Sequence, residues 1–69
     1  MKVEVLVADE HPIIRFGLTA LLDASHDMTV GGEAADGHQT LELIRQREWG
    51  LVVLDLCMPG RNGLELIKL

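Results

Sequence analysis

Apolar residues along this chain form three short runs, which alternate with segments of helical spacing. The runs are Val3–Ala8, Met28–Ala34 and Leu51–Leu54. The first is rich in β-branched residues and stops at acidic residues, which predicts a buried strand. The second contains Gly31 and Gly32, which offer no side chain for packing, so we expect a weaker strand at an edge of the sheet. The third is uninterrupted, as is typical of a central parallel strand covered on both faces.

The segment after the first run has the spacing of a helix. Pro12 suits the first turn of a helix, and Ile14, Leu18 and Leu22 recur at helical intervals. The pattern predicts a helix from Pro12 through Ala24. Further apolar residues widen its apolar stripe, and this width predicts burial of the stripe against a sheet.

A second helix is predicted between the second and third runs. Asp36 is a suitable N-cap, Leu41 and Ile44 share one face, and Gly50 is expected to end the helix. Trp49 lies beside that glycine, and we interpret it as a packing cap at the helix end rather than as a binding anchor.

Strands and helices thus alternate, with short connections between them. This order predicts parallel strands joined by right-handed crossovers in an α/β fold. Residues 59–63 are rich in turn formers, and a third helix is predicted to begin near Asn62. The 69 residues allow one domain at most. Because they stop at Leu69 inside that helix, without a capping signal, we expect a fragment of a longer polypeptide.

Composition and charge disfavour several classes of protein. The chain is 48% hydrophobic and 25% charged, as in folded domains. A formal net charge of −5, with no cluster of basic residues, predicts no direct contact with nucleic acid. Cys57 is the single cysteine, no secretory signal is evident, and no apolar run approaches the ~20 residues of a membrane span. We therefore expect a cytoplasmic protein without membrane contact.

Acidic residues follow two of the three apolar runs. Asp9 and Glu10 follow the first run, and Asp55 follows the third. Carboxyl ends of parallel strands share one edge of a sheet, so these side chains are expected to meet there. Crowded carboxylates repel one another unless a cation neutralises them, and Mg²⁺ prefers oxygen ligands and pairs with phosphate. The pattern predicts a Mg²⁺-assisted phosphoryl acceptor. The alternative is structural: Asp9 and Glu10 would interact with the positive end of the helix dipole, and Asp55 would be a strand-terminal or turn residue.

Further polar residues are candidates for the same site. The main-chain carbonyl of Cys57 could face the cation, whereas catalytic use of its thiol is not expected, because no partner histidine is evident. The histidines, at positions 11, 26 and 38, lack zinc-site spacing and are interpreted as surface or capping residues. Arg15 and Arg61 are interpreted as solvated, although Arg61 lies in the loop beside the predicted pocket and there could meet an incoming phosphate.

Two stretches, 5–12 and 54–63, resemble the receiver domains of two-component response regulators. That family has a flavodoxin-like (CheY-like) doubly wound parallel sheet, of which this chain would hold the part from the first strand to the start of the third helix. The stretches 32–37 and 11–12 look most like the NarL/FixJ subfamily, whose members usually carry a C-terminal LuxR-type DNA-binding domain. The resemblance covers residues 1–69.

The resemblance implies roles for the acidic residues. Asp55 corresponds to the phosphoacceptor that receives a phosphoryl group from a sensor histidine kinase. Asp9 and Glu10 correspond to the pair that holds Mg²⁺, Glu10 directly and Asp9 through water, and the Cys57 carbonyl completes the ligands. The family most often has Asp where this chain has Glu10. Such a module is not a multiple-turnover enzyme, because it catalyses only its own phosphorylation and dephosphorylation, in a single turnover. In the full-length protein it would regulate transcription.

Two other functions stay open at this point. A phosphorylation-independent interaction module would result if Glu10 prevents metal binding, and a Mg²⁺-dependent phosphatase would use Asp55 as a nucleophile. In the flavodoxin-like strand order 2-1-3-4-5, a chain that ends after its third strand leaves that strand as an open edge, so we also expect either a homodimer through this edge or the ordered remnant of a longer polypeptide.

Overall fold

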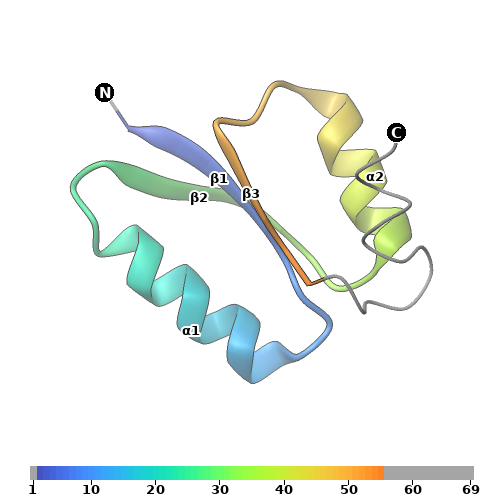
Figure 1. Ribbon diagram of the computed structural model, residues 1–69, viewed down its shortest axis with the longest axis horizontal. Coiled ribbons are helices and arrows are strands. Elements are labelled where there is room, and N and C mark those ends of the chain that lie inside the picture. The colour runs from blue at the N-terminus through green and yellow to red at the C-terminus, as the bar shows by residue number, and fades with distance from the viewer. Residues whose placement is uncertain (1, 56–69) are drawn as a thin grey trace.

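The protein contains a three-stranded parallel sheet with two helices. The computed structural model describes residues 2–55, with strands β1 (Val3–Ala8), β2 (Met28–Ala34) and β3 (Leu51–Leu54) and helices α1 (Pro12–Asp23) and α2 (Gly37–Gln46). The strand order is β2-β1-β3 (Figure 1). The predicted α/β fold and its strand order are confirmed. The predicted third helix lies outside the described residues.

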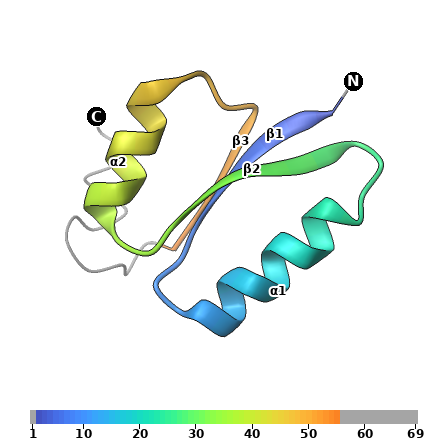
Figure 2. The ribbon, with the colours of Figure 1, turned by 180° about the vertical axis from the view of Figure 1, so that it is seen from behind.

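The two helices cover opposite faces of the sheet. Both views show α1 on one side of the strands and α2 on the other (Figures 1 and 2). A parallel crossover of one hand places its helix on one face, and reversing the direction of travel across the sheet places the next helix on the other face. Here the chain moves from β1 to β2 and then back past β1 to β3, which is the doubly wound arrangement that the sequence predicts.

β1, and not β3, is the central strand of the described sheet. Its residues Val5, Leu6 and Val7 are 0% exposed, whereas Leu51 at the start of β3 is 42% exposed. Within residues 2–55, β3 pairs with β1 alone. The apolar run of β3 predicts a central strand, whereas the expected strand order predicts an open edge; within residues 2–55 β3 has the edge position.

The apolar stripe of α1 is only partly buried. Leu18 and Leu22 are half-buried, but Phe16 is 75% exposed and Leu21 is 74% exposed. The expected burial of the whole stripe is thus wrong for the described residues. A helix rests on a sheet along a narrow line, so side chains at the margins of a wide stripe extend past the contact.

The predicted cap of α2 is confirmed. A carboxylate oxygen of Asp36 accepts from the backbone N–H of Gln39 at 2.8 Å, and the side chain of Gln39 accepts from the N–H of Ala35 at 2.8 Å. The predicted end of the helix is wrong: α2 ends at Gln46 and the next residue, Arg47, is fully extended. Gly50 instead lies directly before β3, and its N–H donates to the carbonyl of Glu4 at 3.0 Å.

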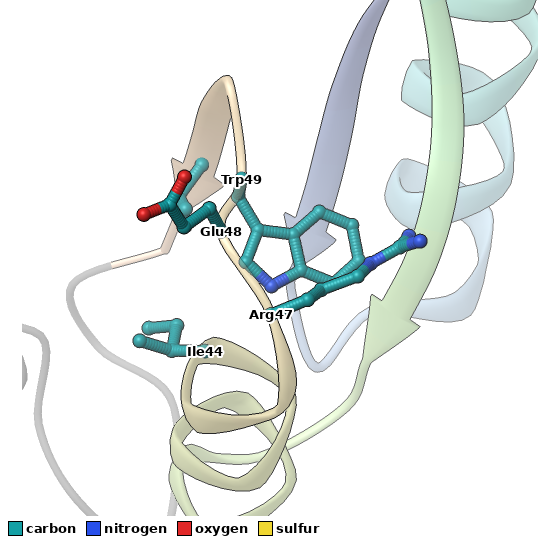
Figure 3. A pocket seen from close by; sticks show the side chains of 5 residues that line it. Ile44, Arg47, Glu48 and Trp49 are labelled. Atoms are coloured by element: carbon teal, nitrogen blue, oxygen red, sulfur yellow. The ribbon is translucent and has the colours of Figure 1, made fainter.

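Trp49 closes the end of α2, as predicted for a packing cap. Its Nε1 donates to the carbonyl of Leu43 at 2.8 Å, and the Arg47 guanidinium lies 4.1 Å from the ring centroid (Figure 3). The glycines of β2 make room for this arrangement. A Cβ on Gly32 would lie 2.9 Å from the Trp49 ring, and one on Gly31 would collide with the guanidinium. The second strand is glycine-rich because an aromatic ring crosses it.

Gly32→Ala is expected to destabilise the protein by about 1–3 kcal/mol, because the added methyl group pushes the Trp49 ring away from its hydrogen bond to Leu43. Urea denaturation followed by circular dichroism measures the change. Gly17→Ala is the matched control, since a Cβ at Gly17 in α1 meets nothing within 4 Å. Alanine there should stabilise by about 0.5–1 kcal/mol through its higher helix propensity. Equal effects at the two positions would contradict this packing.

Candidate functional site

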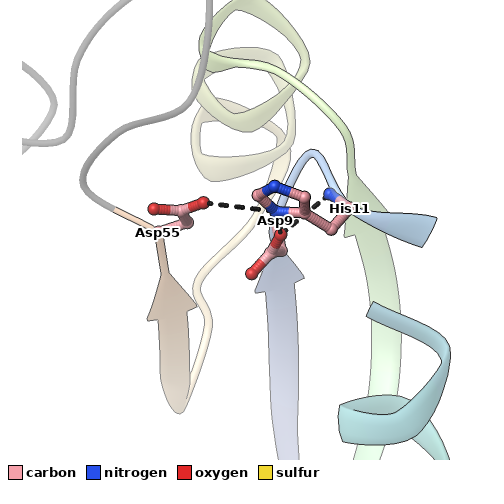
Figure 4. Close-up of side chains that lie close together, drawn as sticks. All are labelled: Asp9, His11 and Asp55. Atoms are coloured by element: carbon pink, nitrogen blue, oxygen red, sulfur yellow. Dashed lines mark hydrogen bonds and ion pairs between the residues drawn. The ribbon is translucent and has the colours of Figure 1, made fainter. Parts of the chain in front are cut away.

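Backbone hydrogen bonds hold Asp9 and Asp55 side by side at the carboxyl end of the sheet. The N–H of Asp9, just after β1, donates to the Ala34 carbonyl of β2 at 3.0 Å. The N–H of Asp55, just after β3, donates to the Ala8 carbonyl of β1 at 2.9 Å. Each residue thus extends the hydrogen-bond pattern of the sheet by one residue beyond its strand, and both carboxylates lie at the carboxyl edge of the sheet (Figure 4). Their predicted meeting is observed.

His11 lies between these two carboxylates. Its Nδ1 is 2.9 Å from an Asp9 oxygen and 3.9 Å from an Asp55 oxygen (Figure 4). One ligand atom from each of the three side chains lies within 4.8 Å of the others. Sequence reasoning missed His11 as a member of the site. The available signal was its position two residues after Asp9 and directly before Pro12, where a helix start restricts the backbone.

Glu10 is placed differently from the other two acids. It is not a member of the group formed by Asp9, His11 and Asp55, and its carboxylate lies 4.0 Å from the far ring nitrogen of His11, Nε2. Its side chain is 38% exposed, against 13% for Asp9. The metal role of Glu10 remains a prediction. Cys57 lies outside the described residues, as does Arg61, so the carbonyl ligand also remains a prediction.

Asp9 has a local structural role in addition to its place in the group. Its Oδ1 accepts from the backbone N–H of His11 at 2.8 Å and from the ring Nδ1 at 2.9 Å. This closes the turn from β1 into α1, whose first turn contains no acidic residue. Asp9 therefore also stabilises the start of α1, as the alternative interpretation expects. This structural role is compatible with a role as a cation ligand.

Arg15 fixes the same turn from the side of α1. Its Nη1 donates to the Asp9 carbonyl at 2.8 Å and its Nε donates to a Glu33 carboxylate oxygen of β2 at 3.2 Å. The side chain is only 21% exposed, so the interpretation of Arg15 as solvated is wrong. A planar guanidinium can serve two acceptors at once, and here it ties the end of β1 to both neighbouring elements.

The pKa values in the group respond to these contacts. Chiefly through its backbone N–H, His11 lowers the pKa of Asp9 below the ordinary value; burial opposes this, and the His11 ring and Arg15 reinforce it. The hydrogen bond to Asp9 raises the pKa of His11 above its ordinary value, burial opposes the rise, and the charges of Asp9, Glu10 and Asp55 add to it. The site therefore favours an ionised Asp9 and a protonated His11.

Asp9→Asn is expected to lower the pKa of His11 back toward its ordinary value, because it removes the largest cause of the rise. NMR titration of the ring resonances measures this, with the rings of His26 and His38 as references within the same protein. An unchanged His11 pKa in the variant would contradict the contact.

The same shifts set the pH dependence of stability. With its raised folded-state pKa, His11 stabilises the fold fully below about pH 6.5, and this contribution is lost as the pH rises through the folded-state value. With its lowered pKa, Asp9 stabilises the fold above about pH 3.9, and this contribution is lost as the pH falls through the folded-state value. The Asp9→Asn variant should therefore unfold at a denaturant midpoint that varies less with pH in both windows.

Neither described helix, α1 or α2, has the length and apolar character that crossing a membrane requires.

Comparison with known proteins identifies the family of this arrangement. The family model of the response regulator receiver domain matches residues 5–69. The chain is 44% identical over 63 residues to the nitrate/nitrite response regulator protein NarL of Escherichia coli K12, a match that covers 91% of this chain and 29% of that protein. The chain thus spans less than a third of the length of this relative.

Solved structures agree with the sequence comparison. The response regulator domain of Thermotoga maritima CheB superposes with a TM-score of 0.93 at 32% identity, covering 99% of this chain and 51% of that one. RcsB from Salmonella enterica serovar Typhimurium, solved on the rprA promoter with the phosphomimetic BeF3⁻, superposes with a TM-score of 0.88 at 31% identity, covering 99% of this chain and 35% of that one. The similarity extends over nearly the entire chain in both structures.

Proposed function

The chain belongs to the response regulator receiver domain family, in its NarL subfamily, and from this premise we propose that Asp55 accepts a phosphoryl group within a two-component system. The observation that carries the proposal is the position of Asp55. Its side chain, 23% exposed, faces Asp9 and His11 at the carboxyl edge of the sheet. A carboxylate there is partly exposed and adjacent to groups that could hold a cation. Residues 1–69 would then be the N-terminal portion of a receiver domain.

The reaction follows from the chemistry of a carboxylate nucleophile. A carboxylate oxygen of Asp55 attacks the phosphorus of a phosphohistidine on a sensor histidine kinase. The P–N bond breaks, its electron pair and a proton remain on the donor imidazole, and an acyl phosphate forms on Asp55. Hydrolysis of that acyl phosphate returns the carboxylate. Asp9 stays ionised through its hydrogen bonds with His11, so the pocket keeps its negative charge before a cation or phosphoryl group enters.

The donor set fits a divalent cation. The carboxylates of Asp9 and Asp55 supply hard oxygen ligands, and we propose that Glu10 and the Cys57 carbonyl contribute as the family resemblance implies. When bound, Mg²⁺ neutralises charge on the transferred phosphoryl oxygens. Asp9 is held by its own backbone, its turn and Arg15, so this ligand is already oriented.

The output of the full-length protein is proposed from its relatives. Escherichia coli NarL is a nitrate/nitrite response regulator, and the RcsB structure holds a promoter. By extension, we propose that this receiver controls a DNA-binding domain outside the present sequence, in the cytoplasm. The net charge of −5 is unfavourable for DNA contact by the receiver itself. A homodimer through the β3 edge remains a proposal, and sedimentation of a stable monomer would contradict it.

Acetyl phosphate and intact-mass measurement test the proposal. With Mg²⁺ we expect one phosphoryl group per chain, and chelation of the cation should abolish the adduct. An adduct that is absent even with Mg²⁺ would favour a phosphorylation-independent interaction module, for which the position of Glu10 outside the acidic group is the supporting observation. Repeated hydrolysis of a phosphate ester, with many turnovers per chain, would instead indicate a phosphatase.

A further inference from the structure

The acidic site of this chain contains a nitrogen donor in addition to its oxygens. We propose that Nδ1 of His11 is a ligand of the cation site, so that the site takes a divalent ion that accepts nitrogen, such as Zn²⁺, with a preference over Mg²⁺ that depends on His11. The inference rests on the proposed function, because it assigns a further ligand to the same pocket.

The distances suit a common ion. Tetrahedral Zn²⁺ with bonds of about 2.1 Å holds its ligand atoms about 3.4 Å apart. Nδ1 of His11 lies 2.9 Å from an Asp9 oxygen and 3.9 Å from an Asp55 oxygen, and all three ligand atoms lie within 4.8 Å of one another. One ion can therefore contact all three side chains after only small side-chain movements.

The ring is oriented before any ion arrives. The backbone N–H of His11 donates to Asp9 at 2.8 Å, and Pro12 fixes the start of α1 directly after it. These contacts direct the imidazole toward the carboxylates, as Figure 4 shows. The His11 side chain is also 57% exposed, so an ion from solvent can reach it.

The donor chemistry distinguishes between cations. Mg²⁺ selects oxygen ligands and keeps several of its waters, so it gains little from an imidazole. Zn²⁺ and similar ions bind imidazole well. In binding, the ion would replace the proton that Nδ1 shares with Asp9, and that proton would pass to solvent. The histidines lack the spacing of a multi-histidine zinc site, but a single histidine between two carboxylates does not need that spacing.

His11→Asn separates the ligand role from the structural role. The asparagine amide can still donate to Asp9 but cannot replace an imidazole nitrogen as a ligand. Calorimetric titration compares Zn²⁺ with Mg²⁺ on the 69-residue chain, with Cys57→Ser in every protein so that no thiol binds the ion. Zn²⁺ affinity should fall at least about tenfold in His11→Asn, while Mg²⁺ affinity should change less than about threefold. His38→Asn, at an exposed position of α2, should change neither.

NMR of the ring nitrogens provides a second readout that needs no His11 variant. Zn²⁺ should shift the Nδ1 signal of His11 and leave His26 and His38 unchanged. The proposal is overturned if only those other rings respond, if His11→Asn binds Zn²⁺ as tightly as its parent, or if Mg²⁺ binds several-fold more tightly in that variant, since the ring would then block the site.

The Mg²⁺-dependent adduct on Asp55 is measured in the same samples. If the adduct forms but His11→Asn does not change Zn²⁺ binding, only this inference is contradicted. If Zn²⁺ binding depends on His11 but no adduct forms, only the proposed function is contradicted.

Discussion

Asp55→Asn is expected to abolish formation of the phosphoryl adduct with acetyl phosphate, a loss of at least about 10³-fold in rate. The amide has nearly the same shape as the carboxylate but lacks its nucleophilic anionic oxygen. Asp55 is joined to the sheet by its backbone N–H, which donates to Ala8 at 2.9 Å, and this bond is retained in the variant. The fold should therefore survive while the chemistry is lost. Intact-mass measurement over time gives the rate.

The matched control is Asp36→Asn. Asp36 caps α2 and is not a member of the acidic group, and asparagine caps helices about as well as aspartate. This variant should form the adduct at the rate of the parent protein. An adduct of undiminished rate on Asp55→Asn would remove Asp55 from its proposed role, and loss of the adduct in both variants would indicate a general effect of lost negative charge.

Leu6→Ala is expected to lower the free energy of unfolding by about 2–5 kcal/mol. Leu6 is fully buried in β1, the central strand, and its Cδ1 lies next to Gly32 of β2. Truncation leaves a cavity in the middle of the sheet that neighbours on both sides cannot fill. Small domains have a total stability of about 5–15 kcal/mol, so this single change removes a large share of it. Urea denaturation followed by the fluorescence of Trp49 measures the loss.

Leu21→Ala is the control for Leu6→Ala. Leu21 lies on α1 and is 74% exposed, so the same truncation should change stability by less than about 1 kcal/mol. Similar losses at both positions would contradict the central position of β1, or would show that the exposed face of α1 is covered in solution.

The two ends of the sheet differ in role: one holds the packed Trp49 ring and the other the acidic group. Trp49 precedes β3 and packs with Arg47 and the glycines of β2, beside an open hollow of about 440 Å³. Asp55 follows β3 at the opposite end, so the strand itself separates the ring from the acidic group. Trp49 fluorescence should thus report unfolding rather than cation binding. This arrangement agrees with the general location of ligand sites at the carboxyl ends of parallel strands.

The sequence by itself determined the elements, the parallel sheet and the meeting of Asp9 with Asp55. These follow from local periodicity and from a topological rule: an acid placed directly after each of two parallel strands must reach the same edge. The N-cap at Asp36 was also predictable from the sequence, because N-capping depends on contacts within four residues.

Only the tertiary structure decided which side chains near that edge face one another. Successive residues after a strand project in different directions, so His11 enters the acidic group while Glu10 lies outside it, although Glu10 is the direct neighbour of Asp9 in the sequence and is acidic like Asp9. The hydrogen bond from Arg15 to Glu33 and the packing of the Trp49 ring on Gly32 join residues that are distant in the sequence, and no local pattern predicts such contacts. Periodicity specifies which face of an element is buried; the identity of the partner depends on how distant segments are brought together.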